Sequence, residues 1–179
     1  MEIFNKIKIV TNRLNLIPLD YHQLVLLKDD QEMLQSELMV GPSKRMNSKE
    51  VEYTLVHNVI PAAELLPEDI LFITRWLLID RNENVIVGDI GFKGAPGKEG
   101  MIEISYNTYP DFYNRGLMTE AITGIKFWAF RQPGVESIIA QTKKSNLASL
   151  KVLVRNGFSP FAVDELMYWW KLDNDIVGL

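Results

Sequence analysis

The sequence predicts a single α/β domain in which helices flank one mixed sheet. Three observations predict it: a length of 179 residues, a hydrophobic content of 47%, and strand-like periods that alternate with helical ones. A chain of this length forms one domain with a sizeable core. Because 23% of the residues are charged, the composition is that of a soluble globular protein. We therefore expect residues 1–179 to form one domain with the element order βααβββαβαβ.

Five elements are expected before residue 93. Leucines at helical spacing fill residues 20–40, with a break at Asp29-Asp30, and Asn47 followed by Glu50 has capping-box spacing for a further helix. Apolar runs on both sides of a polar turn at 81–84 predict a hairpin. The expected ranges are a strand at 14–18, a broken helix at 20–40, a helix from 47 to about 59 before Pro61, and strands at 70–79 and 85–92.

The second half of the chain alternates between strands and helices. Residues 93–100 include three glycines and a proline, which predicts a loop, and Pro133-Gly134 ends the clearest helical stripe. Gly157 closes the last helix. The expected ranges are a strand at 101–109, a helix at 117–131, a strand at 135–141, a helix at 146–156 and a strand at 166–172.

Several classes of protein are excluded by composition. With no cysteine the chain has no disulfide, thiolate metal site or cysteine nucleophile, and two histidines argue against a His-rich metal site. No apolar run reaches the length of about 18 residues that a membrane span needs. The first residues lack the pattern of a secretory signal. We expect a cytoplasmic protein with no metal and no membrane contact.

Charge is distributed unevenly along the chain. The net charge of −4 argues against a general nucleic-acid binder. Residues 113–156 hold seven basic and two acidic residues, a charge of +5, whereas the rest holds 12 basic and 21 acidic residues, a charge of −9. This distribution suggests a small polyanionic ligand on one side and a cationic partner on the other, although solvated helix faces would give the same pattern.

The segment from Tyr113 to Met118 carries a possible anion site, since it joins a strand to a helix through Gly116. The first free N–H groups of a helix point outward and favour negative charge, and glycine lets a backbone approach closely. No Gly-Lys-Ser/Thr follows, so the turn is not a P-loop, and Gly88, Gly91 and Gly94 do not form a dinucleotide fingerprint. Taken alone, the single glycine before a helix favours a plain strand-to-helix connection over an anion site.

Two longer motifs give this turn a family resemblance. The stretch EISYNTYPDFYNRGLMTEA at 103–121 is similar to the acetyl-CoA-binding core of the GNAT N-acetyltransferases, above all to the RimJ/RimL-like branch that acetylates N-termini of ribosomal proteins. NLASLKVLVRNGF at 146–158 and the opening TNRL at 11–14 resemble the same branch. Two positions depart from its pattern, Tyr113 in place of Gln or Arg and Met118 in place of a small residue.

The resemblance implies the GNAT fold, with a mostly antiparallel sheet, and acetyl-CoA as cosubstrate. Glu103 takes the place of a carboxylate that removes the amine proton through water, and Ser149 is the candidate acid for the leaving thiolate. Leu153 stands where many members carry a tyrosine acid. The implied cofactor-binding residues are Tyr106, Asn107, Thr108, Tyr113, Asn114, Arg115, Gly116, Leu117, Met118 and Asn146.

Three functional hypotheses follow. The first is an enzyme that transfers acetyl to a primary amine by direct attack, with a protein N-terminus or a small cationic amine as acceptor and His22 or His57 as weaker candidate bases. The second is a catalytically degenerate module that binds or senses acetyl-CoA. The third is an interaction module, in which the aromatic strand at 166–172 pairs with a partner or with a second copy to form a homodimer.

Overall fold

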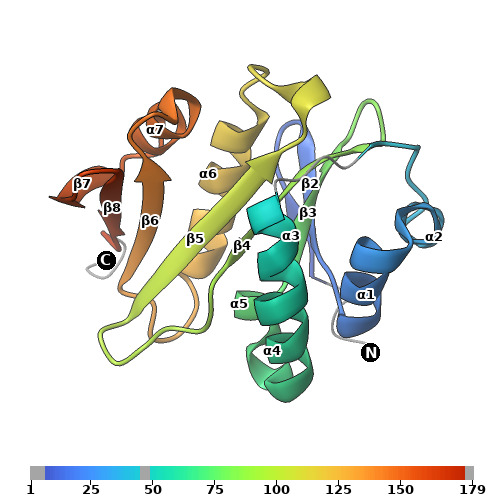
Figure 1. The fold of residues 1–179 in the computed structure, drawn as a ribbon, viewed down its shortest axis with the longest axis horizontal. Coiled ribbons are helices and arrows are strands. Elements are labelled where there is room, and N and C mark those ends of the chain that lie inside the picture. Colours follow the sequence, from blue (N-terminus) through green and yellow to red (C-terminus); the bar gives the residue numbers. More distant parts are fainter. Residues whose placement is uncertain (1–6, 45–48, 176–179) are drawn as a thin grey trace.

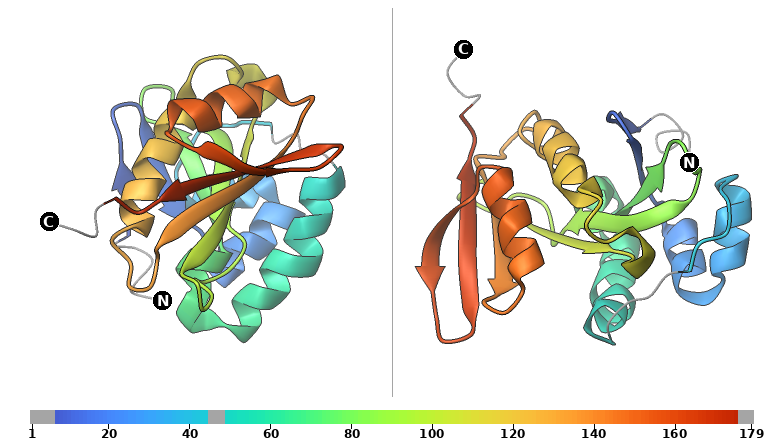
Figure 2. Two further views of the ribbon diagram at one scale, coloured as in Figure 1. Left: turned by 90° about the vertical axis from the view of Figure 1, so that its left-hand side faces the viewer. Right: turned by 90° about the horizontal axis from the view of Figure 1, so that it is seen from above.

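The computed structural model describes residues 7–44 and 49–175 and contains one eight-stranded sheet (Figure 1). The strand order is β1-β2-β3-β4-β5-β6-β8-β7. Helix α6 lies on one face of the sheet, and the helices of the first half of the chain lie on the other (Figure 2). The predicted fold class is therefore confirmed, since neighbouring strands pair antiparallel except for β5 and β6.

The element bounds are as follows. The strands are β1 (Ile9–Val10), β2 (Leu14–Pro18), β3 (Arg75–Asp80), β4 (Ile86–Phe92), β5 (Met101–Thr108), β6 (Ser137–Lys143), β7 (Ser159–Val163) and β8 (Met167–Asp173). The α-helices are α1 (Tyr21–Asp29), α2 (Gln31–Glu37), α3 (Lys49–Thr54), α4 (Ile60–Leu65), α5 (Ile70–Ile73), α6 (Leu117–Ala129) and α7 (Leu147–Arg155). Short segments of other helical types are η2 (Leu55–Val59), η3 (Pro67–Asp69) and η4 (Pro110–Phe112).

Each face of the sheet carries its own core, because successive side chains of a strand point to opposite faces. Trp76 and Leu78 of β3 pack in the core under α6, whereas Leu77 and Ile79 pack in the core formed with α1, α2 and α4. All residues of β3 and β4 are buried. Both strands are central and covered on both sides, which explains why their sequences lack a clean alternation of polar and apolar residues.

Strands β5 and β6 separate after a short parallel contact. They pair only from Met101↔Ser137 to Glu103↔Ile139, although β5 continues to Thr108 and β6 to Lys143. Figure 1 shows the two arrows diverging from that point. Strand β4 still pairs with β5 up to Thr108. Beyond Glu103, one edge of β5 therefore has no strand partner within the described part of the chain.

Two of the sequence predictions are wrong in detail. Residues 70–73, expected in a strand, form helix α5, because a short apolar run does not distinguish a buried helical turn from a strand. The helix expected to end near Val59 continues through Pro61 to Leu65, and Asn47, its predicted start, lies outside the described residues. The π-helical turn η2 ends just before Pro61, which stands in the first turn of α4. A backbone N–H at that position has no partner within its own helix, so a proline there does not break the run.

The aromatic last strand is internal to the sheet. Strand β8 lies between β6 and β7, so the backbone edges that could pair with a partner are already used. The prediction missed its outer neighbour β7, all of whose residues are exposed, and the two-residue β1. Trp76, Trp128 and Trp170 pack in or against the core under α6, as expected for core residues.

Candidate functional site

A groove of about 640 Å³ opens where β5 and β6 separate. Its walls come from the end of β5, the turn before α6, and α7. The predicted acid Ser149 lines it, and so do all the predicted cofactor residues except Arg115. Those that line it are Tyr106, Asn107, Thr108, Tyr113, Asn114, Gly116, Leu117, Met118 and Asn146. The structure thus brings together residues from three separate stretches of sequence.

The turn before α6 presents backbone N–H groups to this groove. Gly116 is the residue before the helix, with φ 73° and ψ 8°, a left-handed conformation that favours glycine. Within the described residues no side chain caps the helix there. Because the first N–H groups of a helix have no carbonyl partner within it, those of Leu117 and Met118 are suited to an anion. The Met118 side chain turns into the core, so the bulk that departs from the family pattern does not fill the groove.

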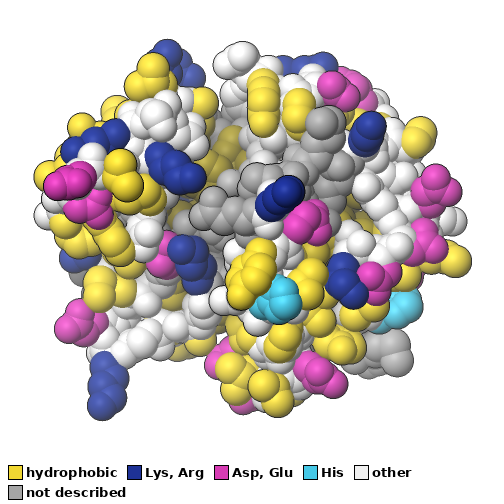
Figure 3. Space-filling view, viewed as in Figure 1, with side chains coloured by type: hydrophobic (Ala, Val, Ile, Leu, Met, Phe, Trp, Pro, Cys, Tyr) yellow, Lys and Arg dark blue, Asp and Glu magenta, His cyan; other side chains and the backbone are white. Residues whose placement is uncertain are grey.

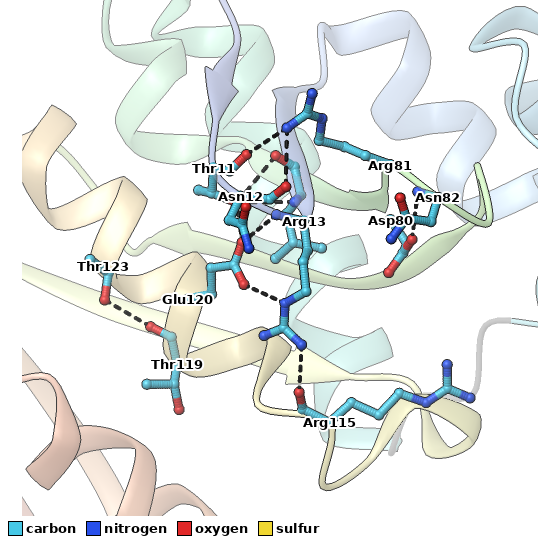
Figure 4. A network of polar contacts seen from close by, with 11 residues as sticks. Thr11, Asn12, Arg13, Asp80, Arg81, Asn82, Arg115, Thr119, Glu120 and Thr123 are labelled. Atoms are coloured by element: carbon cyan, nitrogen blue, oxygen red, sulfur yellow. Dashed lines mark hydrogen bonds and ion pairs between the residues drawn. The ribbon is translucent and has the colours of Figure 1, made fainter.

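Glu120 fixes the start of α6 to the N-terminal strands (Figure 4). Its carboxylate accepts hydrogen bonds from the Thr11 hydroxyl at 2.6 Å, from the Arg13 backbone N–H at 2.6 Å and from Arg13 Nε at 2.7 Å. Arg13 also donates to the carbonyl of Arg115 at 2.9 Å. Burial raises the pKa of Glu120, but these hydrogen bonds outweigh it and hold that pKa below its ordinary value. The first turn of α6 is therefore held in place by a charged contact.

Arg115 points away from the groove. Its guanidinium donates to Glu83 Oε1 at 2.8 Å and to the carbonyl of Asp111 at 3.0 Å, and it stacks over the ring of Phe112. These contacts tie the turn to the hairpin between β3 and β4. The Arg115 side chain thus holds the shape of the turn and does not face a ligand in the groove.

The first turn of α7 forms the opposite wall. Asn146 caps this helix, since its side chain accepts a hydrogen bond from the backbone N–H of Ser149 at 3.1 Å. The Ser149 hydroxyl lies 2.6 Å from that of Tyr106 on β5. Burial raises the pKa of Tyr106 to about 12, an effect that the hydrogen bond with Ser149 only partly offsets.

Basic side chains line the α7 side of the groove. Lys151 and Arg155 both contribute to it, and they belong to the segment with a charge of +5. Figure 3 shows Lys and Arg side chains on the side of the molecule that carries α7 and β6, beside a hollow in this face. This arrangement fits the polyanionic ligand that the charge distribution suggests.

A second, smaller pocket of about 210 Å³ lies on the other face of the sheet. Its walls come from the helical run from α3 to η2, from β3 and β5, and from Lys93 in the loop after β4. Arg75 lines it and donates to Asp89 of β4 and, at 2.7 Å, to the Ser105 hydroxyl. Tyr106 and Asn107 line both cavities, so the two meet at the end of β5.

Glu103 lines neither cavity. It lies where the pairing of β5 and β6 ends, and its carboxylate is ion-paired with Lys93, which lines the second pocket. The two candidate histidines also lie outside both cavities: His22 is 3.4 Å from Glu37, and His57 packs against the ring of Tyr53. Sequence reasoning missed Arg75, Lys93 and Asp89, because nothing local in the sequence marks residues that meet only across the sheet.

Comparison with known families decides the classification. The family model described as "Acetyltransferase (GNAT) domain" matches residues 13–159, which is most of the chain. This protein belongs to the GNAT acetyltransferase family. Two curated relatives come from Bacillus subtilis. "Uncharacterized N-acetyltransferase YjdG" is 35% identical over a match that covers 46% of this chain and 49% of that protein. "Uncharacterized N-acetyltransferase YoaA" is 30% identical over a match that covers 47% of this chain and 48% of that protein. The matched part thus spans about half the length of these relatives.

Solved structures agree on the fold. A ribosomal-protein-S5-alanine acetyltransferase from Vibrio fischeri has a TM-score of 0.68 and 15% identity, covering 95% of this chain and 98% of that one. A RimL ribosomal L7/L12 alpha-N-protein acetyltransferase in complex with coenzyme A has a TM-score of 0.65 and 15% identity, covering 94% and 99%. The RimJ/RimL-type neighbours are the branch that the sequence motifs indicate.

In the ranges 7–44 and 49–175, no three His, Asp or Glu side chains are grouped so that they could hold a metal ion. Among the helices of the same ranges, none is both long and apolar enough to cross a bilayer.

Proposed function

We propose that this protein is an acetyl-CoA-dependent N-acetyltransferase that moves an acetyl group to a primary amine by direct attack. The observation that carries the proposal is the meeting of two cavities at Tyr106 and Asn107, one beside a helix N-terminus and one on the opposite face of the sheet. A groove of about 640 Å³ is within the usual range of small-molecule sites. We take the whole chain as one N-acetyltransferase domain acting in the cytoplasm.

Phosphate groups of the cosubstrate would lie at the turn from Tyr113 to Met118. The N–H groups of Leu117 and Met118 supply donors there, and the helix dipole favours negative charge. Lys151 and Arg155 add positive charge across the groove. Since most of these donors belong to the backbone, the change of side chain at Tyr113 leaves them in place.

The free edge of β5 would bind the rest of the cosubstrate. Past Glu103 this edge has no strand partner in the described chain, so its backbone groups can pair with the amides of pantetheine as a further strand would. A backbone N–H of Tyr106 or Thr108, which alternate with the residues bonded to β4, would then donate to the thioester carbonyl. This oxygen gains negative charge as the amine attacks, and a fixed donor stabilises it most at that stage.

Proton transfer is assigned to two side chains by the family resemblance. Ser149 lines the groove and would protonate the leaving thiolate. Glu103 would take the ammonium proton of the acceptor through water, because its carboxylate is beside the second pocket but not in its wall.

The acceptor would enter through the second pocket, whose charge favours a protein N-terminus over a polyamine. Arg75 and Lys93 line it, and none of its described lining residues is acidic. A polycationic amine needs carboxylates that pair with its remaining charges, whereas an N-terminal residue presents one amine followed by peptide carbonyls, which accept from such donors. The RimL neighbour's name, a ribosomal alpha-N-protein acetyltransferase, supports the same choice.

Release of free thiol from acetyl-CoA tests this proposal. Short peptides with a free N-terminus, the same peptides with a blocked N-terminus, and a polyamine are compared as acceptors. We expect thiol release with the free peptides only, and a loss of at least about tenfold in Glu103→Gln. Binding of acetyl-CoA with no thiol release from any amine would instead support the degenerate binding module.

A further inference from the structure

Tyr106 lies at the junction of the two cavities, and its hydroxyl is on the groove side of the sheet. It is one of two residues that line both cavities, and the only one of the two whose side chain carries a hydroxyl. Its hydroxyl is 2.6 Å from that of Ser149, and either oxygen can be the donor in this hydrogen bond. The pair therefore links a residue at the junction of the two cavities to the residue assigned as the acid.

Both partners are held by structure outside the pair. Tyr106 packs on the same core as Ile104, its neighbour two positions earlier on β5, so its side chain points to the α6 and α7 side of the sheet. The backbone N–H of Ser149 is fixed by the cap from Asn146. The two hydroxyls come from elements 43 residues apart in sequence and are part-buried. Such a contact limits the freedom of both side chains and keeps the two oxygens within hydrogen-bond distance.

We infer that, in the proposed acetyl transfer, Tyr106 and Ser149 form a relay that carries a proton from the attacking amine to the leaving thiolate. Once Glu103 has taken the first proton of the ammonium, the amine is neutral, and its nitrogen forms a bond to the acetyl carbon while the carbon–sulfur bond breaks and its electron pair stays on sulfur. The amine proton passes to Tyr106 Oη, the Tyr106 proton passes to Ser149 Oγ, and the Ser149 proton passes to sulfur. Both side chains end as they began, and the products are the amide and the free thiol.

The state of the phenol favours a relay over a simple acid. Burial keeps the pKa of Tyr106 at about 12, so the side chain is neutral near pH 7 and does not readily become a tyrosinate. A neutral hydroxyl that accepts one proton while donating another never carries a charge. Ser149 also stays neutral in this way. Its hydroxyl is a poor acid by itself, but it can donate its proton to sulfur while it accepts one from Tyr106. Tyr106 thereby supplies a proton route that Leu153, in place of the usual tyrosine, cannot.

Conservative variants test the relay. Tyr106→Phe and Ser149→Ala are compared, singly and together, with Tyr168→Phe, a matched control on β8 that lines neither cavity. For each we would measure kcat, the KM for acetyl-CoA, the calorimetric affinity for acetyl-CoA, and the rate in mixtures of H₂O and D₂O. Because the two hydroxyls act in series, we expect kcat to fall by about 100-fold in either single variant and no further in the double variant.

The other readouts separate a relay from a structural role. We expect the KM and affinity for acetyl-CoA to stay within about twofold of wild type in Tyr106→Phe. In the mixtures of H₂O and D₂O, the way the wild-type rate changes with the D₂O fraction should indicate that more than one proton moves in the rate-limiting step. In Tyr106→Phe the same plot should indicate fewer moving protons. Any of three results would overturn the relay. They are a kcat of Tyr106→Phe equal to that of wild type, a loss in the double variant that combines the two single losses, and a loss of acetyl-CoA affinity as large as the loss of rate.

The relay rests on the proposed function, and the same assay distinguishes the two failures. If wild type releases no thiol with any amine, the transferase proposal and the relay both fail. If wild type is active and Tyr106→Phe is equally active, the relay alone fails, and Ser149 then exchanges its proton with water.

Discussion

The two helical walls of the main groove are built differently. Helix α6 buries six residues, Leu117, Met118, Ala121, Ile122, Ile125 and Ala129, whereas α7 buries Leu153 alone. The start of α6 is also fixed by Glu120, while α7 is joined to α6 near its other end, where Thr123 and Lys126 donate to Asn156 at 2.9 and 2.8 Å. The difference separates two tasks. In the proposed function, the anchored wall holds the N–H groups for phosphate, and the lightly packed wall carries Ser149, the proposed acid.

The largest effect should come from removing core packing under the anchored wall. Ile122 is fully buried, so Ile122→Ala should lower the free energy of unfolding by about 3 kcal/mol. Val154 on α7 is 59% exposed, and Val154→Ala should lower it by less than about 0.5 kcal/mol. Denaturant unfolding of both variants measures this. Equal losses would remove the distinction between the walls.

The charged contact at the start of α6 should have the next largest effect. Glu120→Gln replaces Oε2, which accepts from Arg13 Nε, with an NH₂ group that can only donate, and it removes the charge that pairs with Arg13. It should cost about 2 kcal/mol of unfolding free energy. Asp173→Asn, which breaks the exposed ion pair with Lys171, is the control and should cost less than about 0.5 kcal/mol. If the two costs match in urea titrations, Glu120 does not anchor the helix.

A smaller effect is expected at the start of the other wall. Asn146→Ala removes the cap of α7 and should cost about 1 kcal/mol, while Asn146→Ser keeps an acceptor and should restore most of it. The rate of thiol release should follow the same order, because the cap positions Ser149. A variant Asn146→Ala with full stability and full rate would show that the first turn of α7 is held by other contacts.

The smallest effect is a dependence of the anchored wall on pH. Hydrogen bonds hold the pKa of Glu120 below its ordinary value of 4.5, so its contribution to stability is present above that value. It should be lost as pH falls from 4.5 through the lower pKa of the folded state. The difference in unfolding free energy between wild type and Glu120→Gln should therefore shrink in this range. A difference that stays constant down to the acid unfolding of the protein would contradict the assignment.

Sequence reasoning succeeded where the signals are local. The strand at 101–108, the turn with Gly116 and the helix that follows are predicted by turn residues and helical spacing, and the two motifs connect them to a family. Contacts across long separations were not predictable in this way. Thr11 and Glu120 are 109 residues apart, and Tyr106 and Ser149 are 43 apart.

The second pocket shows the same limit. It forms between the helical run around η2 and strands that come later in the chain, and the π-helical turn that carries the run past Pro61 has no clear sequence signal. Arg75 and Asp89 are ordinary charged residues in sequence, and only the pairing of β3 with β4 brings them together. The groove beside α6 was therefore predictable, whereas the second pocket was not.

Binding of acetyl-CoA, measured by calorimetry, tests the central claim most directly. Wild type is compared with Gly116→Trp, which puts a bulky side chain on the turn that lines the groove, and with Gly97→Trp, a control in the 93–100 loop where an added Cβ meets no neighbour. We predict micromolar binding by wild type and by Gly97→Trp, and none by Gly116→Trp. No binding by wild type, or unchanged binding by Gly116→Trp, would contradict the assignment of this groove to the cosubstrate.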